Sequence, residues 1–421
     1  MSRSGRPLVE LAQTGVLITL VVLAAYTNSS GLSADKQVYE LHAKSLTVEL
    51  PFPIGSELPI VPVRINDTGH RFCLDTGSTE SVFGKRLLGS FGPYQETVRV
   101  RAFHKPFSVK RYGAPKDVNV AGIKFSDKPG FIVADMNWVP NEEFSGFIGM
   151  DFLMRFVVQL DFSQQKIRFF TALPDGAGYA IPLYFNKTAL PQCLVTFGNG
   201  GFEPIYFAVD TGAPAGFNVS PHLLVRLAES GQLDNVSFSS RETSDGTHSV
   251  LDARVANVQV GPIATHGANV CADGGDRNVI GIEYLSRFLV TFDFPGKQMY
   301  LRPRRVGIRS DWGDRSGIRL SRNATDVSVI GVVRSSPAEE CGIKVGDGLE
   351  SFEGQPALEL SGHELRSRFA ENRRTFRLVV SRDDARIPVL LKTRDFSDPV
   401  RPEEFECFLW ESFYPADVPD R

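Results

Sequence analysis

The sequence predicts a mainly β protein with two homologous lobes and a smaller α+β unit toward its C-terminal end. Two observations indicate the lobes. A block of about 130 residues occurs twice, and each copy contains apolar runs that stop at Gly, Pro or Asp, as strands do. The third observation is a change of pattern after Pro303, which indicates the extra unit. The length of 421 residues also exceeds one core and fits two or three domains of ~100–200 residues.

The composition is that of a folded globular protein and narrows the classes of function. Hydrophobic residues make up 42% of the chain and charged residues 23%, which argues against a disordered or fibrous protein. The net charge of −3 supplies no basic field for nucleic acid, so no nucleic-acid partner is expected. Five cysteines without a Cys-x-x-Cys spacing argue against a cysteine zinc site and against a disulfide-dense scaffold.

Residues 1–34 are interpreted as a signal peptide or a membrane anchor. Arg3 and Arg6 precede an uncharged stretch over 11–34, whose densest apolar run is 16–26. A basic start and a short apolar run are typical of a signal peptide, because a membrane span needs ~20 apolar residues. An uncleaved anchor and a buried helix are the alternatives, in that order. The working protein is therefore expected outside the cytoplasm, either periplasmic or secreted.

Two pairs of matching segments define the duplication. FIGMDFLMRFVVQLDF at 147–162 aligns with VIGIEYLSRFLVTFDF at 279–294, with 8 of 16 positions identical. RFCLDTGS at 71–78 aligns with YFAVDTGA at 206–213. Because both matches occur in the same order at nearly the same offset, we expect one lobe over 45–172 and a second over 178–304.

Each lobe is expected to be built mostly from strands, with one short helix near its end. In the first lobe, strand-like runs at 57–66 and 71–74 stop at Asp75. In the second lobe, runs at 189–197 and 203–209 stop at Asp210. Apolar residues at helical spacing then predict short helices at 150–156 and 282–288.

The repeated strand end carries the candidate chemistry. Asp75-Thr76-Gly77 is followed by Ser78, and Asp210-Thr211-Gly212 is followed by Ala213. A single Asp-Thr-Gly is an ordinary turn, but two copies inside a duplicated block indicate a pair of carboxyl groups brought together by pseudo-two-fold packing. Two carboxyl groups at ~3 Å share a proton, because both cannot ionise. One then acts as a base toward water, and the protonated one donates to a substrate carbonyl.

These motifs resemble the aspartic proteases, in the form of two retropepsin-like lobes fused into one chain as in a short relative of pepsin. The resemblance covers about 45–304 and adds apolar-apolar-Gly at 147–149 and 279–281. It implies polypeptide substrates and neither a metal nor a cofactor. The residues it assigns are the catalytic Asp75 and Asp210, the reciprocally bonded Thr76 and Thr211, and the supporting Gly77, Ser78, Gly212, Ala213, Gly149 and Gly281.

The resemblance also implies a flap that closes over the substrate. Tyr112-Gly113 in the first lobe and Asp245-Gly246 in the second are the expected hairpin tips, where they would contact substrate. Tyr112 is interpreted either as a flap tyrosine or as a tyrosine at the edge of a turn.

One difference between the two loops predicts an asymmetric dyad. Ser78 can donate a hydrogen bond to Asp75, whereas Ala213 offers Asp210 no comparable side chain. Since a donor stabilises the charged form, we expect Asp75 to ionise more readily and Asp210 to hold the proton. The alternative is that backbone amides dominate in both loops.

A linker over 305–316 and a unit over 317–394 follow the lobes. Ser-Pro-Ala-Glu-Glu-Cys-Gly-Ile-Lys-Val-Gly-Asp at 336–347 resembles the PDZ domains linked to bacterial proteases. Such domains bind extended peptides or C-termini by strand addition, and the resemblance places the carboxylate-binding loop at Ser316, Gly317 and Ile318. The alternative is a unit that only packs on the lobes. An acidic tail rich in aromatic residues occupies 395–421.

The sequence therefore predicts an aspartic endopeptidase, periplasmic, secreted or membrane-anchored, whose PDZ domain binds polypeptide substrates. The alternative is a catalytically silent bilobal protein that binds peptides without cleaving them, because a fold by itself does not prove activity. A monomer is expected, since both halves of the dyad lie in one chain.

Overall fold

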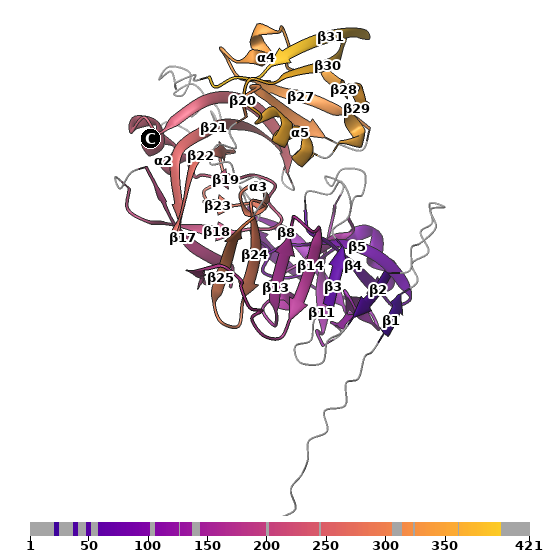
Figure 1. The fold of residues 1–421 in the computed structure, drawn as a ribbon. Coiled ribbons are helices and arrows are strands. Elements are labelled where there is room, and N and C mark those ends of the chain that lie inside the picture. The colour runs from indigo at the N-terminus through magenta and orange to yellow at the C-terminus, as the bar shows by residue number, and fades with distance from the viewer. Residues whose placement is uncertain are drawn as a thin grey trace, which may run out of the picture.

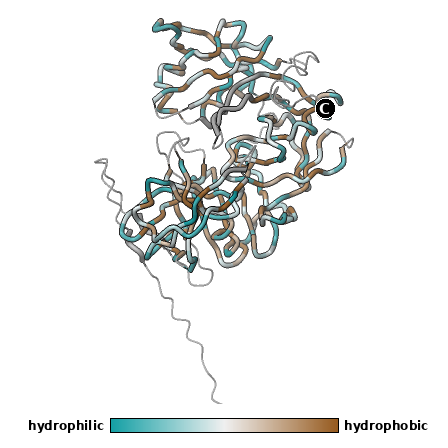
Figure 2. Tube along the Cα trace, turned by 180° about the vertical axis from the view of Figure 1, so that it is seen from behind, coloured by the Kyte–Doolittle hydropathy of each residue, from teal (hydrophilic) through white to brown (hydrophobic). Residues whose placement is uncertain are grey.

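The computed structural model describes residues 21–24, 37–40, 48–51, 58–101, 106–125, 127–136, 144–198, 202–243, 246–304, 314–322, 325–360 and 362–396. Strands dominate these residues, which confirms the mainly β class (Figure 1). The apolar residues run along the strands of the lobes (Figure 2), and the buried ones form a continuous core that reaches from Val48 to Leu301.

The first lobe is a nine-stranded sheet, and one of its strands ends directly before the candidate catalytic residue Asp75. The strand order is β10-β9-β4-β5-β12-β6-β11-β8-β7. Strand β5 stops directly before Asp75 and runs parallel to β12, with Leu74 opposite Ile148. The elements are β4 (Ile60–Ile65), β5 (Thr68–Leu74), β6 (Val82–Gly84), η1 (Lys85–Ser90), β7 (Tyr94–Arg101), β8 (Pro106–Gly113), β9 (Val118–Val120), β10 (Ile123–Lys124), β11 (Gly130–Ala134), β12 (Gly146–Ile148) and α1 (Met150–Leu153).

The second lobe repeats this arrangement in an eight-stranded sheet of order β16-β17-β18-β23-β19-β22-β21-β20. Strand β18 stops directly before Asp210 and runs parallel to β23, with Val209 opposite Ile280. The elements are β16 (Tyr184–Phe185), β17 (Pro191–Phe197), β18 (Ile205–Val209), β19 (Phe217–Asn218), α2 (Pro221–Glu229), β20 (Leu233–Thr243), β21 (Gly246–Val260), β22 (Ile263–Ala272), β23 (Val279–Ile280) and α3 (Ile282–Leu285).

A six-stranded sheet joins the two lobes. Its order is β15-β25-β24-β13-β14-β3, and its elements are β3 (Val48–Pro51), β13 (Val157–Asp161), β14 (Lys166–Phe170), β15 (Tyr179–Pro182), β24 (Phe288–Asp293) and β25 (Gln298–Pro303). Strands β13 and β24 pair antiparallel across the pseudo-two-fold, and Gln159 donates from Nε2 to Thr291 Oγ1 at 3.0 Å. The duplicated segments are thus the ones that meet at the centre of the molecule.

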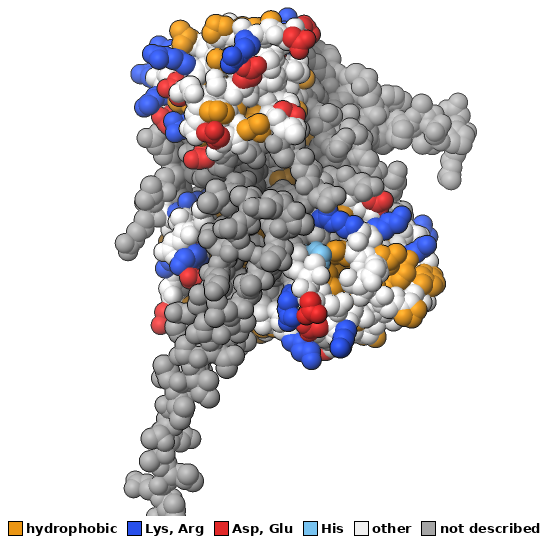
Figure 3. All heavy atoms as spheres, turned by 90° about the vertical axis from the view of Figure 1, so that its right-hand side faces the viewer, with side chains coloured by type: hydrophobic (Ala, Val, Ile, Leu, Met, Phe, Trp, Pro, Cys, Tyr) orange, Lys and Arg blue, Asp and Glu red, His pale blue; other side chains and the backbone are white. Residues whose placement is uncertain are grey.

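The C-terminal unit is an α+β domain with a core of its own. Its sheet has the order β26-β27-β28-β30-β31, with β29 paired to β28. The elements are β26 (Ile318–Arg322), β27 (Val327–Val332), α4 (Pro337–Glu340), β28 (Gly348–Phe352), β29 (Gln355–Pro356), η3 (Ala357–Glu359), α5 (Gly362–Phe369), β30 (Thr375–Arg382) and β31 (Ala385–Lys392). This unit lies over the second lobe, with β27 next to β20 (Figure 1). On the face shown in Figure 3, basic and acidic side chains of the unit lie close together, in keeping with the small net charge.

Most of the N-terminal segment interpreted as a signal or anchor lies outside the described residues. Its described part is β1 (Val21–Ala24), which pairs antiparallel with β2 (Gln37–Glu40). Among the described residues, none of the helices has both the length and the apolar character that crossing a bilayer requires. The linker residues 305–313 and the tail beyond Phe396 also lie outside the described residues.

Packing of the six-stranded sheet generates a stability prediction. Phe292 of β24 is 1% exposed and its ring stacks on Phe294 at 5.4 Å between centroids. Phe292→Ala is therefore expected to lower the free energy of unfolding by about 3–5 kcal/mol, measured by urea denaturation, because a large buried ring leaves a cavity. Tyr179→Ala on the same sheet, where the side chain is 55% exposed, is the matched control. A loss below about 1 kcal/mol for Phe292→Ala would contradict the packing.

Candidate active site

The two candidate carboxyl groups stand at equivalent strand ends of the two lobes. The Asp75 N–H donates to Ile148 O at 2.9 Å, and the Asp210 N–H donates to Ile280 O at 2.9 Å. Each bond continues the parallel pairing of the strand before the Asp with the apolar-apolar-Gly strand of the same lobe. The backbone therefore presents both residues in the same way, related by the pseudo-two-fold.

Each carboxyl group packs against the glycine of the opposite loop. A Cβ atom added to Gly77 would lie 2.1 Å from Asp210 Oδ2, and one added to Gly212 would lie 2.8 Å from Asp75 Cγ. No side chain fits at either position without moving the facing carboxyl group. The close approach brings Asp75 and Asp210 together, and a hydrogen bond links their side chains.

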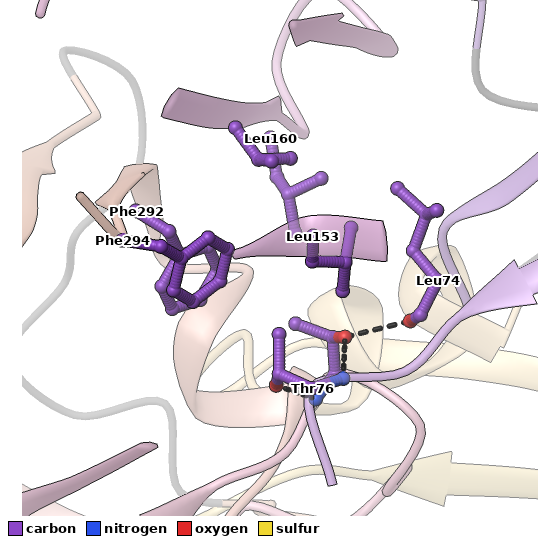
Figure 4. Close-up of a pocket in the computed structure, with 8 residues that line it drawn as sticks. Leu74, Thr76, Leu153, Leu160, Phe292 and Phe294 are labelled. Atoms are coloured by element: carbon purple, nitrogen blue, oxygen red, sulfur yellow. Dashed lines mark hydrogen bonds between the residues drawn. The ribbon is translucent and has the colours of Figure 1, made fainter. Parts of the chain in front are cut away.

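Two threonines connect the loops to each other through four hydrogen bonds, and Figure 4 marks hydrogen bonds at Leu74 and Thr76. Thr76 Oγ1 donates to Val209 O at 2.6 Å and accepts from the Thr211 N–H at 3.0 Å. In return, Thr211 Oγ1 donates to Leu74 O at 2.6 Å and accepts from the Thr76 N–H at 3.1 Å. Both threonines are 2% exposed. Each hydroxyl thus satisfies one donor and one acceptor of the other lobe's backbone, which fixes the distance between the two strand ends.

The threonine pair sits on a small apolar gap at the six-stranded sheet. The gap is lined by Leu74, Thr76, Leu153, Val158, Leu160, Thr211, Phe292 and Phe294 (Figure 4). These residues come from both lobes, so the hydrogen bonds of the loops are shielded from water on this side. Such shielding strengthens them and raises the cost of breaking one.

Burial and mutual repulsion shift the proton affinity of the pair. Burial, followed by the negative charge of Asp210, raises the pKa of Asp75 well above its usual range. Burial also raises the pKa of Asp210, but the hydrogen bond from Asp75 and the N–H groups of Gly212 and Ala213 act against that rise. Burial and the close approach of the two groups therefore favour a pair that shares one proton.

The backbone amides favour Asp210 as the anion, which is the opposite of the order expected from the sequence. Asp210 Oδ1 accepts from two amides, Gly212 N at 2.8 Å and Ala213 N at 3.1 Å, whereas Asp75 Oδ1 accepts from Gly77 N at 2.8 Å. The Ser78 hydroxyl, expected to donate to Asp75, donates instead to Glu80 O at 2.7 Å. The Ser78 donor on which the expected order depended is therefore absent from Asp75, and the backbone amides remain as the donors to both carboxyl groups.

Gly149 and Gly281 lie under the two loops. A Cβ on Gly149 would lie 2.7 Å from Ser78 O, and a Cβ on Gly281 would lie 2.5 Å from Ala213 O. Both obstacles are backbone atoms of the loop that carries the Asp. A side chain at either glycine would therefore displace the loop, because a backbone cannot swing aside as a flexible side chain can.

The prediction that Tyr112 and Gly113 form the tip of a hairpin in the first lobe is wrong. Tyr112 and Gly113 end strand β8, and the turn between β7 and β8 falls at 102–105, outside the described residues. Gly113 serves a close approach instead of a turn, because a Cβ there would lie 3.4 Å from Gly92 Cα. The Tyr112 ring packs edge-on against Tyr94 at 5.9 Å. Tyr112 therefore lies at the base of this hairpin.

In the second lobe the hairpin of β20 and β21 turns where the sequence predicted it. Thr243 pairs with Gly246, which leaves residues 244 and 245 for the turn. Asp245 itself lies outside the described residues, and Gly246 begins β21.

A charged network behind the Asp75 loop was not anticipated from the sequence. Arg111 of β8 donates to both oxygens of Glu80 at 2.9 Å, and Lys128 bridges Glu80 at 3.1 Å and Asp151 at 2.5 Å. Asp151 also accepts from the Ser81 hydroxyl at 2.7 Å. The hydrogen bonds from Arg111 lower the pKa of Glu80 to about 2, despite the opposing effect of burial.

This network belongs to the first lobe alone at the aligned positions. The repeat places Ala215 and Gly216 where the first lobe has Glu80 and Ser81. The departure of these two positions from the repeat is the signal in the sequence that indicates this difference between the lobes.

The loop at 316–318, which was expected to bind the C-terminal carboxylate of a peptide, binds the side chain of Asp314 instead. The N–H groups of Ser316 and Gly317 each donate to Asp314 at 2.9 Å, and Arg319 donates to the same side chain at 3.0 Å. The Ile318 N–H donates to Ser316 Oγ at 3.0 Å. In this structure, the three amides expected to meet a peptide terminus are therefore engaged within the loop.

This chain resembles known proteins in structure and not in sequence. No protein-family model matches the sequence, and no curated protein matches it. One solved structure that the chain resembles is an aspartic proteinase from Irpex lacteus, with 12% sequence identity and a TM-score of 0.43, over 63% of this chain and 99% of that one. At this identity and score the chemistry of the site has to rest on the geometry of the chain itself. Among the described residues, no group of three or more His, Cys, Asp or Glu side chains is arranged to hold a metal ion.

The reciprocal hydrogen bonds of Thr76 and Thr211 predict that removal of either hydroxyl destabilises the fold. Thr76→Val leaves Val209 O and the Thr211 N–H without their partners, so the free energy of unfolding is expected to fall by about 2–4 kcal/mol, at about 1–3 kcal/mol for each buried group. Thr211→Val should cost a similar amount, and the double variant less than the sum, since the two hydroxyls stabilise one contact. Thr188→Val, where the hydroxyl is exposed and bonds Asn186, is the control. Equal stability of Thr76→Val and Thr188→Val would contradict this role of the buried hydroxyls.

The raised pKa of Asp75 predicts that the fold loses stability as the pH rises above the ordinary pKa of an aspartate. Because the pKa of Asp75 is raised, the folded state holds more protons than the unfolded state above the ordinary value of 3.8, and stability falls as pH rises through that window. Asp75→Asn removes this fall, so its melting midpoint should rise relative to the wild type between pH 4 and pH 7, to be measured by thermal denaturation.

Asp347→Asn is the control of opposite sign. Hydrogen bonds from Arg382 lower the pKa of Asp347, so this carboxylate stabilises the fold above the ordinary pKa. Its Asn variant should lose stability relative to the wild type as pH rises. If the melting midpoints of the wild type and Asp75→Asn change with pH in the same way, the raised pKa of Asp75 is contradicted.

Proposed function

We propose that this chain is an aspartic endopeptidase, which hydrolyses peptide bonds with a water molecule activated between Asp75 and Asp210. The observation that carries the proposal is the pair itself: two hydrogen-bonded carboxyl groups, Asp210 buried and Asp75 partly buried, each packed against the glycine of the other loop. A protein has little reason to bury two acids against each other for stability, since burial penalises their charge. A shared proton, by contrast, provides an acid and a base at one point.

The assignment of the proton gives each carboxyl group a role. Asp210, favoured as the anion by two backbone amides, takes a proton from water while the water oxygen bonds to the carbonyl carbon of the substrate. Asp75 donates its proton to the carbonyl oxygen as negative charge develops there. Collapse of the tetrahedral intermediate breaks the C–N bond, and the leaving nitrogen receives the proton that Asp210 took from water. One hydroxyl of the intermediate returns a proton to Asp75 as the C=O bond of the product forms. No covalent bond to the protein forms.

The C-terminal unit is proposed to position polypeptide substrates as a PDZ domain does. Strand β26 is at the edge of its sheet, and an edge strand can pair with an extended peptide. Since Asp314 occupies the amides of Ser316 and Gly317, we expect an internal extended segment to be a better ligand than a chain terminus. A periplasmic or secreted location, with an N-terminal signal or anchor, completes the proposal.

The decisive experiment separates cleavage from binding. We expect the wild type to cleave peptides from a proteome-derived library between pH 4 and pH 7, with inhibition by a statine-type compound. Asp75→Asn and Asp210→Asn should each reduce kcat/KM by at least about 10²–10⁴-fold, the typical share of a general acid or base. Asp67→Asn, at a fully exposed turn, is the matched control.

Two outcomes would count against the proposal. Binding of the statine-type compound without cleavage of any library peptide would favour the silent peptide-binding protein. Cleavage that survives in both Asn variants of the dyad would assign the activity to another site or to a contaminating protease.

A further inference from the structure

The segment that follows the Asp75 loop is joined to the short helix α1 by backbone and side-chain hydrogen bonds. The Met150 N–H donates to Ser78 O at 2.8 Å. In the other direction, Asp151 Oδ1 accepts from the Ser81 N–H at 3.0 Å and from the Ser81 hydroxyl at 2.7 Å. The Asp75 loop, the segment after it and α1 therefore form one hydrogen-bonded unit.

Glu80, in the same segment, connects this unit to the hairpin of β7 and β8. Arg111 of β8 donates to both Glu80 oxygens at 2.9 Å, and its Nε donates to Glu96 of β7 at 2.9 Å. Lys128 adds a second connection, because its Nζ lies 3.1 Å from Glu80 and 2.5 Å from Asp151 of α1. The side chains of Arg111 and Lys128 are 17% and 22% exposed, so water screens these contacts only in part.

The contact between Arg111 and Glu80 fixes the orientation of the two groups as well as their distance. A guanidinium that donates two parallel hydrogen bonds to one carboxylate sets both. A single exposed ion pair contributes little, whereas pairs with this geometry in a network do contribute. Because the hydrogen bonds from Arg111 lower the pKa of Glu80 to about 2, the carboxylate stays ionised over the whole range from pH 4 to pH 7. The connection therefore persists where the dyad shares its proton.

The second lobe has a different arrangement at the aligned positions. Ala215 occupies the place of Glu80 in the repeat and offers a guanidinium no partner. Glu283, the counterpart of Asp151, accepts from Asn269 Nδ2 of β22 at 2.7 Å. In the second lobe the short helix is thus held by a neighbouring strand, whereas the first lobe adds a charged connection between its catalytic loop and its hairpin.

We infer that Glu80 is a positioning residue, which joins the β7–β8 hairpin to the Asp75 loop so that the two keep a fixed relation. This inference rests on the proposed endopeptidase function. Glu80 acts on Asp75 through the chain between them, and Arg111 carries the connection to the hairpin. Proton transfer requires the carboxyl group within hydrogen-bond distance of the substrate carbonyl oxygen, so a small displacement of the loop slows the reaction.

Hydrogen exchange followed by mass spectrometry tests the connection without relying on activity. In Glu80→Gln, exchange is expected to become at least about tenfold faster in both the Asp75 loop and β8, since the loss of one charge-assisted hydrogen bond accounts for such a factor. Glu49→Gln is the matched control, because Glu49 also accepts from a lysine and an arginine, Lys166 at 2.5 Å and Arg168 at 2.6 Å, but lies on β3 of the six-stranded sheet. This control should leave exchange in both segments unchanged.

Steady-state kinetics test the consequence for the reaction. Glu80→Gln should lower kcat by about 10- to 100-fold with KM close to that of the wild type, because the catalytic group is displaced while substrate binding is kept. Arg111→Met should lower kcat to a similar extent, and the double variant no further, since both changes break the same connection. Glu80→Asp, which keeps the charge, should retain a higher kcat than Glu80→Gln. Glu49→Gln should keep the kcat of the wild type.

The outcomes separate this inference from the proposed function. Faster exchange in β8 alone would overturn the inference, because the hairpin and the Asp75 loop would then not be connected through Glu80. A wild-type kcat in Glu80→Gln would overturn it as well, and so would effects of Glu80→Gln and Arg111→Met that multiply in the double variant. Equal kcat values for Glu80→Asp and Glu80→Gln would exclude a role for the charge. If the wild type cleaves no library peptide, the endopeptidase proposal fails whatever the exchange shows, and the catalytic role of Glu80 fails with it.

Discussion

The reciprocal hydrogen bonds of Thr76 and Thr211 are the contact on which the rest of the site depends. Two buried carboxyl groups repel each other when both are charged and lose hydration energy even when one is protonated. Without a rigid connection the two loops would separate, and the two carboxyl groups would no longer share a proton. Each threonine hydroxyl spans the boundary between the lobes and satisfies backbone groups of the other one. The hydrogen bonds of the loop backbones thus hold a pair that electrostatics alone would drive apart.

The duplication supplies symmetry, and a few substitutions within it remove the symmetry where chemistry needs two different groups. Asp210 accepts one more backbone amide than Asp75, which is enough to favour the anion there. Glu80 anchors β8 of the first lobe through Arg111, whereas the second lobe has Ala215 at that position. Under the proposed function this difference has a use, because a peptide bond has an acyl side and an amine side, and a site with two unlike halves can orient it.

The proposed function gives the C-terminal unit a role in binding polypeptides next to that of the lobes. Its core is separate from that of the lobes, and β27 lies beside β20, one strand of the hairpin that rises from the second lobe (Figure 1). A segment bound along β26 would therefore lie one strand away from this contact, because β26 pairs with β27. The loop before β26 is closed internally by Asp314, so strand pairing, and not capture of a terminus, is the interaction left available there.

The sequence by itself determined the features that depend on local pattern. The repeat predicted two lobes, the apolar runs predicted strands that stop at Asp75 and Asp210, and the change after Pro303 predicted a further α+β unit. These predictions succeed because strand alternation and turn residues are read from neighbours in the chain. The pairing of the two Asp-Thr-Gly loops could also be anticipated, since a duplicated unit packs about a two-fold axis.

Only the tertiary structure decided where hydrogen bonds between distant residues go. The Ser78 hydroxyl turned to Glu80 O, Tyr112 fell at the base of its hairpin, and Asp314 took the amides expected for a ligand. A side chain with several possible partners chooses among them by the directions that packing leaves open, and those directions are set by residues far away in the chain.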